Sequence, residues 1–472
     1  MRRLASAALV VALVHLATTR YVGFRRHRAV AAPEPCHSGL RVSLVVSSVG
    51  SGTGDTRLLE VNWEDAPLQA GDYMAVFDED PALATGHAPL FSFTPATPSG
   101  STKTDLISKI PDDDIGYVER CYGHWVAYLR PAAAGGTADV LASACVKTRP
   151  TWMHDLRPQI GQKRLRDLFI PGSHDSGSFA EGEGDRLTKY TYTQEESILH
   201  QLIFGCRYLD IRVGYYPPSV RRLDNGTWVQ VDPGDVPDED VFWVNHGIVK
   251  IRKLKVVLDS VKEFLSSTKE IVIFDVQEFP VGFSGSDDGL AAHVRLMAFL
   301  GRELGPYAAN VSMGGMWWDT PLNTFWKEDR RLIIGYDNSD AREKAQEIAE
   351  AEGKGRGGSI IWKEVTQKWG NVRSTEDLRA YLTAVLGAPP SSVWSAMAEL
   401  TPNAWDIISD GPGGLRKMAD AVNRNVSEWF GGTWGHYANV VATDYFRANE
   451  VVEAAIAWNF RRAVWSTECR KL

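Results

Sequence analysis

The sequence predicts an α/β protein in which an all-β sandwich precedes an irregular (β/α)8 barrel. Residues from about 40 to 148 contain short strand-like runs separated by Gly-, Pro- and Asp-rich turns, which is typical of a sandwich of about a hundred residues. From about 152 to 466, strand-like runs alternate with helix-length amphipathic stretches, as in βα units around a parallel sheet. A chain of 472 residues, 44% hydrophobic and 23% charged, is long enough for both parts.

Residues 1–22 have the features of a secretory signal peptide. Arg2 and Arg3 form a short positive region, and an apolar stretch from Leu4 to Thr18, interrupted by His15, follows. This stretch is short for a membrane span, so cleavage is favoured over retention as a signal anchor, and no later segment is apolar enough to span. We therefore expect a secreted protein without a transmembrane segment in the mature chain.

Sequons and cysteines agree with secretion. N-x-S/T sequons predict glycosylation at Asn225, Asn310 and Asn425. The five cysteines suit an oxidising compartment. One disulfide is expected among Cys36, Cys121 and Cys145, and a Cys36–Cys145 bridge would join the two ends of the β-rich region. Cys206, inside a strand pattern, is expected to be a buried free thiol.

The strands of the β-rich region are predicted from alternating apolar residues, as at Val42, Leu44 and Val46. They span residues 41–49, 57–64, 72–80, 124–131 and 138–147. The acidic run from Asp78 to Asp80 is more often a solvated loop than a cation site. This region contains no catalytic constellation, and we interpret it as a structural or targeting module.

The barrel strands are predicted from apolar runs that are separated by amphipathic helices. The strands span 166–171, 206–213, 242–247, 270–279, 330–337, 359–365, 393–401 and 438–446, and the clearest helices span 256–267, 291–304, 375–386 and 414–430. Eight such strands in about 310 residues fit a (β/α)8 barrel. An open doubly wound sheet is the alternative, but no Gly-rich phosphate loop follows any of these strands.

Polar residues gather where these strands end, which is where active sites of barrels lie. They are His174, Asp175, Asp210, Arg212, His246, Asp275, Gln277, Glu278 and Asp444. Asp210 and Arg212 are two residues apart on one strand and therefore point to the same face. We expect these side chains to converge on one pocket mouth.

Two histidines, one arginine and several carboxylates suit cleavage of a phosphodiester without a metal. An arginine fork clamps phosphate oxygens and keeps its charge. One neutral imidazole can accept a proton from the attacking oxygen, and a second, protonated, can donate one to the leaving oxygen. Carboxylates orient each imidazole and support its charged form.

The stretches LFIPGSHDSGSF, TQEESILHQLIFGCRYLDIRV, VNHG, EIVIFDVQEF and NVVATDYF resemble, in order, motifs of the phosphatidylinositol-specific phospholipase C X-domain family. The likeness covers residues 165 to 446 and is closest to X-domain proteins that lack PH, EF-hand and C2 modules. It implies a distorted TIM barrel that cleaves inositol phospholipids, or a related phosphodiester such as a GPI anchor, to diacylglycerol and a cyclic inositol phosphate.

The resemblance also implies residue roles. His174 would be the general base for the inositol 2-hydroxyl and His246 the general acid for the diacylglycerol oxygen. Asp444 would support His174, and Asp175 would support His246. The likeness places the remaining two catalytic candidates, Asp210 and Arg212, at the phosphate.

Arg212 decides the expected cofactor. In the large eukaryotic enzymes, Ca²⁺ is held by an Asn after the first His and by an acid-x-acid pair on the second strand. This sequence has Asp175 and Asp210-x-Arg212 at those positions. A guanidinium and a hard cation would compete for one place, so Arg212 is predicted to substitute for the metal and the activity to need no cofactor.

The inositol pocket is less closely specified. The resemblance and the strand-end positions suggest Gln277, Glu278, Tyr336, Lys363, Trp369 and Asn371 as substrate-binding residues. Trp317 and Trp318 offer a transient contact with a membrane surface, where Trp is favoured, although packing under a loop is an equal alternative.

Other functions remain open at this point. The net charge of −8 and pI near 5.8 argue against nucleic acid as a partner. A glycerophosphodiesterase or sphingomyelinase D-like barrel also pairs two histidines with strand-end acids, but it needs the acid-x-acid metal site that Arg212 interrupts. The third alternative is a catalytically weak lipid- or protein-binding secreted protein.

Overall fold

The computed structural model describes residues 39–49, 57–83, 88–108, 115–132, 136–182, 188–222, 227–285, 287–313 and 317–464. The predicted signal peptide, the sequon at Asn225, Cys36 and Cys469 lie outside the described residues. Within those ranges, no helix combines the length and apolar character that crossing a membrane requires.

Two antiparallel sheets form the N-terminal region. The first has the order β1 (Arg41–Val46), β2 (Leu58–Glu64), β5 (Gly100–Ile107), and the second has the order β4 (Phe91–Phe93), β3 (Tyr73–Phe77), β6 (Cys121–Arg130), β7 (Asp139–Lys147). One hydrophobic cluster takes Leu44 and Val61 from the first sheet and Met74 and Val126 from the second. The antiparallel all-β character follows from the alternation of apolar residues seen in the sequence.

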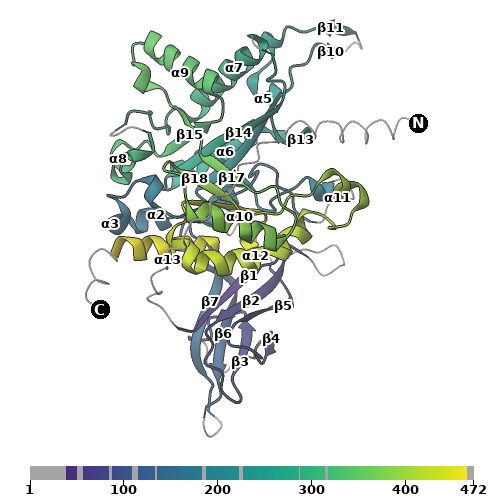
Figure 1. The fold of residues 1–472 in the computed structure, drawn as a ribbon, viewed down its shortest axis with the longest axis vertical. Coiled ribbons are helices and arrows are strands. Elements are labelled where there is room, and N and C mark those ends of the chain that lie inside the picture. The colour runs from purple at the N-terminus through teal and green to yellow at the C-terminus, as the bar shows by residue number, and fades with distance from the viewer. Residues whose placement is uncertain are drawn as a thin grey trace.

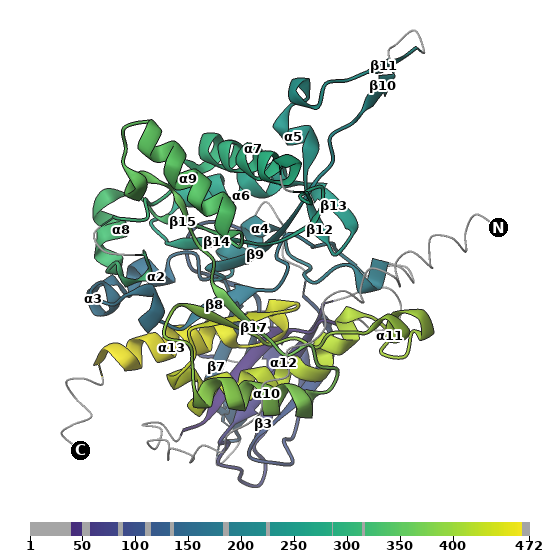
Figure 2. The same cartoon turned by 45° about the horizontal axis from the view of Figure 1, so that its top comes forward.

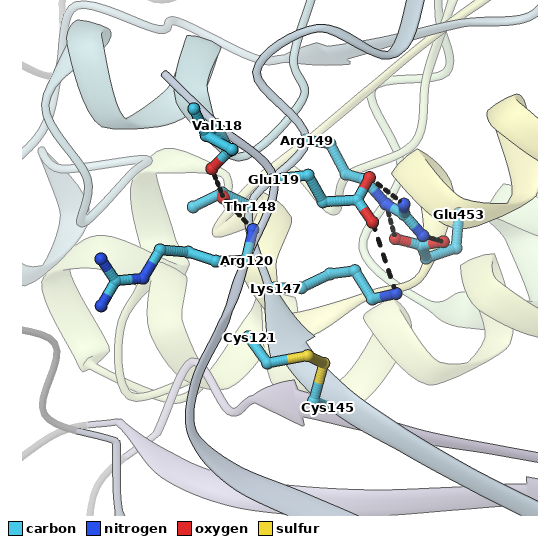
Figure 3. Close-up of a disulfide and its surroundings, with 9 residues drawn as sticks. All are labelled: Val118, Glu119, Arg120, Cys121, Cys145, Lys147, Thr148, Arg149 and Glu453. Atoms are coloured by element: carbon cyan, nitrogen blue, oxygen red, sulfur yellow. Dashed lines mark hydrogen bonds and ion pairs between the residues drawn. A yellow bond between two sulfur atoms is a disulfide. The ribbon is translucent and has the colours of Figure 1, made fainter. Parts of the chain in front are cut away.

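A disulfide joins β6 to β7 where the chain leaves this region (Figure 3). It pairs Cys121 with Cys145, at a Cα–Cα distance of 5.7 Å, and so corrects the bridge suggested between Cys36 and Cys145. Neighbouring antiparallel strands bring these two cysteines within bridging distance. Cys206 is buried and free, as predicted. Beyond the disulfide, Arg149 pairs with Glu453 and fastens the exit of β7 to the second region (Figure 3).

The second region is built on a curled sheet whose main path has eight parallel strands. In spatial order they are β16 (Ile361–Lys363), β15 (Leu332–Tyr336), β14 (Val272–Val281), β9 (Tyr208–Tyr215), β8 (Ile170–Ser173), β19 (Val440–Thr443), β18 (Trp394–Met397) and β17 (Thr366–Trp369). In the described part of the chain no ladder joins β16 to β17, so the sheet is an incompletely closed barrel. The strands β8, β15, β18 and β19 are buried along their whole length, as their apolar runs predicted.

The strand predicted at 242–247 does not belong to the parallel set. It forms β12 (Phe242–His246), which runs antiparallel to the end of β9 and makes a hairpin with β13 (Val249–Lys253). The eighth parallel strand is instead β17, which the sequence did not reveal because Thr366, Gln367 and Lys368 interrupt any apolar run. His246 therefore lies on a hairpin beside the barrel strands.

Helices cover the outside of the sheet, and the four predicted from the sequence are all present. The longer ones are α6 (Leu254–Ser267), α7 (Asp287–Leu304), α9 (Ser339–Ala351), α10 (Thr375–Gly387), α12 (Leu415–Gly431) and α13 (Val451–Val464). The shorter ones are α2 (Trp152–Asp155), α3 (Arg157–Ile160), α4 (Ile198–Ile203), α5 (Asp238–Val241), α8 (Leu322–Glu328) and α11 (Ala404–Ser409). Figure 1 shows the N-terminal sheets next to α12 and α13. The hairpin of β10 (Val220–Arg222) and β11 (Trp228–Gln230) projects from the molecule (Figure 2).

A buried ion pair closes the end of the barrel opposite the predicted site. Arg207, just before β9, donates to Glu270, just before β14, at 2.7 Å, and both side chains are inaccessible to solvent. Glu270 also accepts the amides of Met153 and His154 in α2, and Arg207 donates to the carbonyl of Pro150. The pair therefore anchors the connection between the two regions to the first residues of two barrel strands.

We expect Glu270→Gln to lower the free energy of unfolding by about 3–5 kcal/mol, because it leaves the buried Arg207 guanidinium without a counter-charge. Urea denaturation should show a lower midpoint at an unchanged m-value. The matched control is Glu119→Gln, since Glu119 pairs with Lys147 and Arg149 at a solvent-exposed position and should cost less than about 1 kcal/mol. Equal effects of the two variants would contradict the anchoring role of Glu270.

Candidate active site

His174 and Asp444 face each other at the ends of neighbouring strands. The last pair of the β8–β19 ladder is Ser173 and Thr443, so the next residue of each strand reaches the mouth at the same level. His174 Nδ1 lies 2.7 Å from Asp444 Oδ1, and both side chains are almost completely buried. The sequence-predicted partnership of these two residues is thus present as a direct hydrogen bond.

The turn after β8 is shaped by Asp210. Asp175 has a φ of 33°, a left-handed conformation that Asp tolerates better than most residues. Its amide donates to Asp210 Oδ2 at 2.9 Å, and the amide of Ser176 donates to the Asp210 carbonyl at 2.8 Å. Asp210 therefore holds the turn that aims His174 into the mouth.

Arg212 occupies the centre of the site. Its Nη2 lies 2.7 Å from His174 Nε2 and 3.4 Å from Asp210 Oδ2, and its Nη1 lies 3.6 Å from Glu278 Oε1. Its Nε is 4.0 Å from Asp175 Oδ2. Although burial disfavours the charged form, the carboxylates of Asp210, Glu278 and Asp175 raise the pKa of Arg212 above its ordinary value. The guanidinium therefore keeps its positive charge at the centre of the site.

The contact with Arg212 fixes the proton on His174. A guanidinium can only donate, so Nε2 must be an unprotonated acceptor and the ring proton must sit on Nδ1, facing Asp444. Burial opposes protonation of the ring, but Glu399 and Asp444 outweigh it and raise the pKa of His174 to about 9. The two observations bear on His174 in opposite directions, because the Arg212 contact requires an unprotonated Nε2 whereas the neighbouring carboxylates favour a protonated ring. The contact corresponds to the neutral ring, which is the form that can act as a base.

His246 is the last residue of β12, next to the turn into β13, and its hydrogen bonding differs from the prediction. The two oxygens of Asp175 are buried without hydrogen-bond partners, so the expected Asp175–His246 bond is not formed here. Burial raises the pKa of Asp175 well above its usual range, although the charge of Arg212 opposes this. Burial, the positive charge of Arg212 and that of His174 when its ring is protonated lower the pKa of His246 to about 3. A neutral His246 must gain a proton before it can act as an acid.

Glu399 is a site residue that the sequence analysis missed. It follows β18, and the amide of the preceding Ala398 donates to the carbonyl of Ala442 on β19. Glu399 is 3% exposed and both carboxylate oxygens lack hydrogen-bond partners. Burial raises its pKa to about 7, and its charge acts on His174 and Arg212. The rule that found the other residues, an acid at the carboxyl end of a strand, applies equally to this one.

Glu399→Gln is expected to shift the pH dependence of catalysis. The charge of Glu399 raises the pKa of His174, so its removal should lower that pKa. A base works only when neutral, so the acid limb of the kcat/KM profile should move to lower pH, by about one unit or more. Glu364→Gln is the control, because Glu364 pairs with Arg342 of α9. An unchanged acid limb in Glu399→Gln would contradict this coupling.

Two of the predicted substrate-binding residues, Gln277 and Tyr336, are buried, and the other four are accessible to solvent. Gln277 lies inside the barrel, donating to Asp275 and to the carbonyl of Val365 at 2.9 Å. Tyr336 is fully buried with its hydroxyl 2.7 Å from His293 Nδ1, so the structure does not bring it to the mouth. Glu278 forms an ion pair with Arg212. Lys363, Trp369 and Asn371 are exposed at the ends of β16 and β17.

The carboxyl groups around Arg212 do not form a metal centre. Among the described residues, no three His, Cys, Asp or Glu side chains are arranged to hold a metal ion. Asp210, Glu278 and Asp175 bring carboxylate oxygens to 3.4, 3.6 and 4.0 Å from the Arg212 guanidinium, which cannot itself be a ligand of a hard cation. That the activity needs no metal ion stays a prediction.

Comparison with known proteins finds relatives at low sequence identity. No family model matches the chain. Human PI-PLC X domain-containing protein 1 is 22% identical over 351 residues, covering 68% of this chain and 95% of that protein. This chain is homologous to the PI-PLC X domain-containing proteins. The human PI-PLC X domain-containing protein 2 is 23% identical over 298 residues, which cover 58% of this chain and 84% of that protein.

Further relatives of this PI-PLC X domain homologue carry related names. The variant-surface-glycoprotein phospholipase C of Trypanosoma cruzi is 24% identical over 329 residues, covering 59% of this chain and 76% of that protein. Among solved structures, a phosphatidylinositol-specific phospholipase C of Staphylococcus aureus has a TM-score of 0.45 at 15% identity, covering 65% of this chain and 97% of that one. The Listeria monocytogenes enzyme of the same name has a TM-score of 0.43 at 16% identity, covering 65% of this chain and 98% of that one.

Proposed function

We propose that this protein is a secreted phosphodiesterase that cleaves phosphatidylinositol-type lipids to diacylglycerol and a cyclic inositol phosphate. The observation that carries the proposal is the contact of His174 with both Asp444 and Arg212 at the mouth of the parallel sheet. An oriented base and a fixed positive charge lie within one hydrogen bond of each other. That is the pair of groups that attack on a phosphodiester by an internal hydroxyl requires.

The proposed reaction begins with the movement of Arg212. The phosphate competes with His174 Nε2 for the guanidinium, and its binding frees the imidazole to accept a proton. The inositol 2-hydroxyl then attacks phosphorus and its proton passes to Nε2, while Asp444 supports the resulting imidazolium. Arg212 stabilises the pentacoordinate phosphate, and Asp210 maintains the turn that positions both groups.

The second proton transfer completes the reaction. The bond from phosphorus to the diacylglycerol oxygen breaks, and protonated His246 donates the proton that this oxygen needs. The negative phosphate raises the pKa of His246 on binding, which offsets the depression caused by burial in the free protein. In this proposal Asp175 orients the ring of His246 once the substrate is bound. No cofactor takes part in this proposal.

A transient contact with a membrane surface is part of the proposal. Apolar side chains are exposed next to the strand ends that carry the site: Ile248, Val249, Trp369, Trp405 and Ile408. Trp405 on α11 is 69% exposed and is well suited to a lipid interface. Trp318 is buried and packs on Trp362, so it is excluded from this role.

Secretion and glycosylation belong to the same proposal. Asn310 is exposed after α7, where a glycan is easily accommodated. Asn425 lies within α12, and the Ser427 of its sequon is buried and bonded to the carbonyl of Asn423 at 3.1 Å. We therefore expect Asn310 to be the better acceptor of these two.

The experiment uses the secreted full chain on phosphatidylinositol vesicles with excess EDTA. Release of diacylglycerol and cyclic inositol phosphate, together with sedimentation of the protein with the vesicles, would support the proposal. Release only after addition of Ca²⁺ or Mg²⁺ would overturn the metal-independent mechanism. Turnover only of glycerophosphodiesters or sphingomyelin would favour the alternative phosphodiesterases, and binding without turnover of any of these lipids would favour a lipid-binding protein.

A further inference from the structure

The segment Thr193–Glu196 holds the backbone of the catalytic strand ends together. The side-chain amide nitrogen of Gln194 donates to the carbonyl of His174 at 2.9 Å and to the carbonyl of Thr443, next to Asp444, at 2.8 Å. Its Oε1 accepts the amide of Phe446 at 3.3 Å, and the side chain is fully buried. One side chain therefore fixes the relative position of the two strands that carry the base and its carboxylate.

Thr193 adds two more contacts to the same loops. Its hydroxyl donates to the carbonyl of Asp175 at 2.9 Å, and its carbonyl accepts the amide of Tyr445 at 2.8 Å. The segment thus bonds to the backbone of residues on both sides of the His174–Asp444 hydrogen bond. A displacement of this segment would be transmitted directly to that bond.

The next residue, Glu195, is clamped between two arginines from different parts of the chain. Arg57, at the start of β2 in the N-terminal region, donates to Oε1 at 3.0 Å. Arg416, in α12, donates to Oε2 at 2.6 Å. Glu195 is buried, so both charge pairs are largely shielded from solvent.

The N-terminal region also reaches Arg416. Arg416 Nη1 donates to the carbonyl of Ser48 at 3.1 Å, and the hydroxyl of Ser48 donates to the Arg416 carbonyl at 2.9 Å. Arg416 lies over the ring of Tyr445, at 4.5 Å from its centre. Ser48, after β1, and Arg57, just before β2, therefore both support the segment Thr193–Glu196. Arg57 contacts Glu195 directly, and Ser48 acts through Arg416.

Other contacts between the two regions lie elsewhere. Lys103 of β5 pairs with Asp420 of α12 at 2.6 Å, and Arg41 of β1 pairs with Glu450 at 3.2 Å. Those pairs fasten the sheets to the outside of helices without contacting Thr193–Glu196. The contact of Arg57 is different, because it ends on Glu195, one residue from Gln194. Ser48 contacts Arg416, which also holds Glu195.

We propose that the N-terminal region acts as a positioning element of the active site, with Arg57 as its principal residue. Arg57 neutralises and holds Glu195, and Gln194 next to it fixes the backbone at His174 and Asp444. The region would then be required for full turnover and is more than a targeting module. For its kinetic readout this inference rests on the phosphodiesterase function proposed above.

The test compares Arg57→Ala with Lys103→Ala, which removes a cation from the same interface away from the segment. Because small displacements of a catalytic base are costly, we expect Arg57→Ala to lower kcat by about tenfold at an unchanged KM. Arg57→Lys should restore most of the rate, since it retains the charge. Lys103→Ala should match wild type.

A second measurement needs no turnover. Amide hydrogen exchange of the full chain should accelerate at His174, Ser176, Tyr445 and Phe446 in Arg57→Ala but not in Lys103→Ala. If the wild type proves inactive on every phosphodiester, this measurement still decides the inference. Unchanged exchange at these amides in Arg57→Ala, or an equal acceleration in both variants, would overturn it.

Discussion

Replacing His174 with alanine is expected to lower kcat on phosphatidylinositol vesicles by a factor on the order of 10² to 10⁴, the usual contribution of a general base. The hydrogen bond that His174 Nδ1 donates to Asp444 orients the imidazole with Nε2 toward Arg212. KM should change little, since the imidazole acts on the attacking hydroxyl. Initial rates of diacylglycerol release at saturating lipid measure the effect.

Two further variants test whether the loss of rate is specific to His174 and its carboxylate partner. Asp444→Asn should lower kcat as well, because an amide cannot stabilise the imidazolium and favours no single tautomer. His124→Ala, on β6 in the N-terminal region, should leave the rate unchanged and controls for the loss of an imidazole. A His174→Ala protein with wild-type kcat would exclude His174 as the base.

The second large effect concerns Arg212. Arg212→Met is expected to reduce kcat by about 10²- to 10³-fold, as when a fixed donor to a transition-state oxyanion is removed. Arg212→Lys should lie between the two, since it keeps a charge but loses the fork that binds two phosphate oxygens. Wild-type activity should be the same in EDTA and in Ca²⁺. Restoration of activity by Ca²⁺ after EDTA treatment would contradict the role given to this arginine.

Arg212→Met should also change the pH profile, in the direction opposite to Glu399→Gln. The positive charge of Arg212 lowers the pKa of His174, so its removal should raise that pKa. The base must be neutral to act, and the acid limb should therefore move to higher pH. Arg295→Met, which removes a guanidinium paired with Asp238 on the outside of α7 and α5, is the control and should leave both rate and profile unchanged.

The sequence placed the candidate residues at the ends of strands because their signal is local. His174, Arg212 and Asp444 each follow a strong apolar run, and the position of a residue at the end of a parallel strand sets its place in the fold. The sequence of a strand does not show whether it runs parallel or antiparallel to its neighbours. The run Phe242–His246 reads the same whether it is parallel or antiparallel, and so its assignment to the parallel set was wrong.

Other features depend on contacts between distant residues. The pairing of Cys121 with Cys145 follows from the β6–β7 ladder, which the spacing of cysteines does not reveal. Tyr336 was assigned to the pocket by its position at a strand end, yet its ring faces the aromatic cluster around His293 and Phe279. Glu399 lies at a strand end but in a region without a recognisable motif, and its burial and its charge interaction with His174 distinguish it from other strand-end acids.

The gap between β16 and β17 has a consequence for how the shape of the mouth can change. In the chain only Glu364 and Val365 separate these two strands, and side chains of β14 hold this link in place. The amide of Val365 donates to Asp275 at 3.1 Å, and Gln277 donates to both Asp275 and the Val365 carbonyl. Because no backbone ladder fixes the distance between β16 and β17, we expect substitutions at Asp275 or Gln277 to change that distance while the paired strands keep their register.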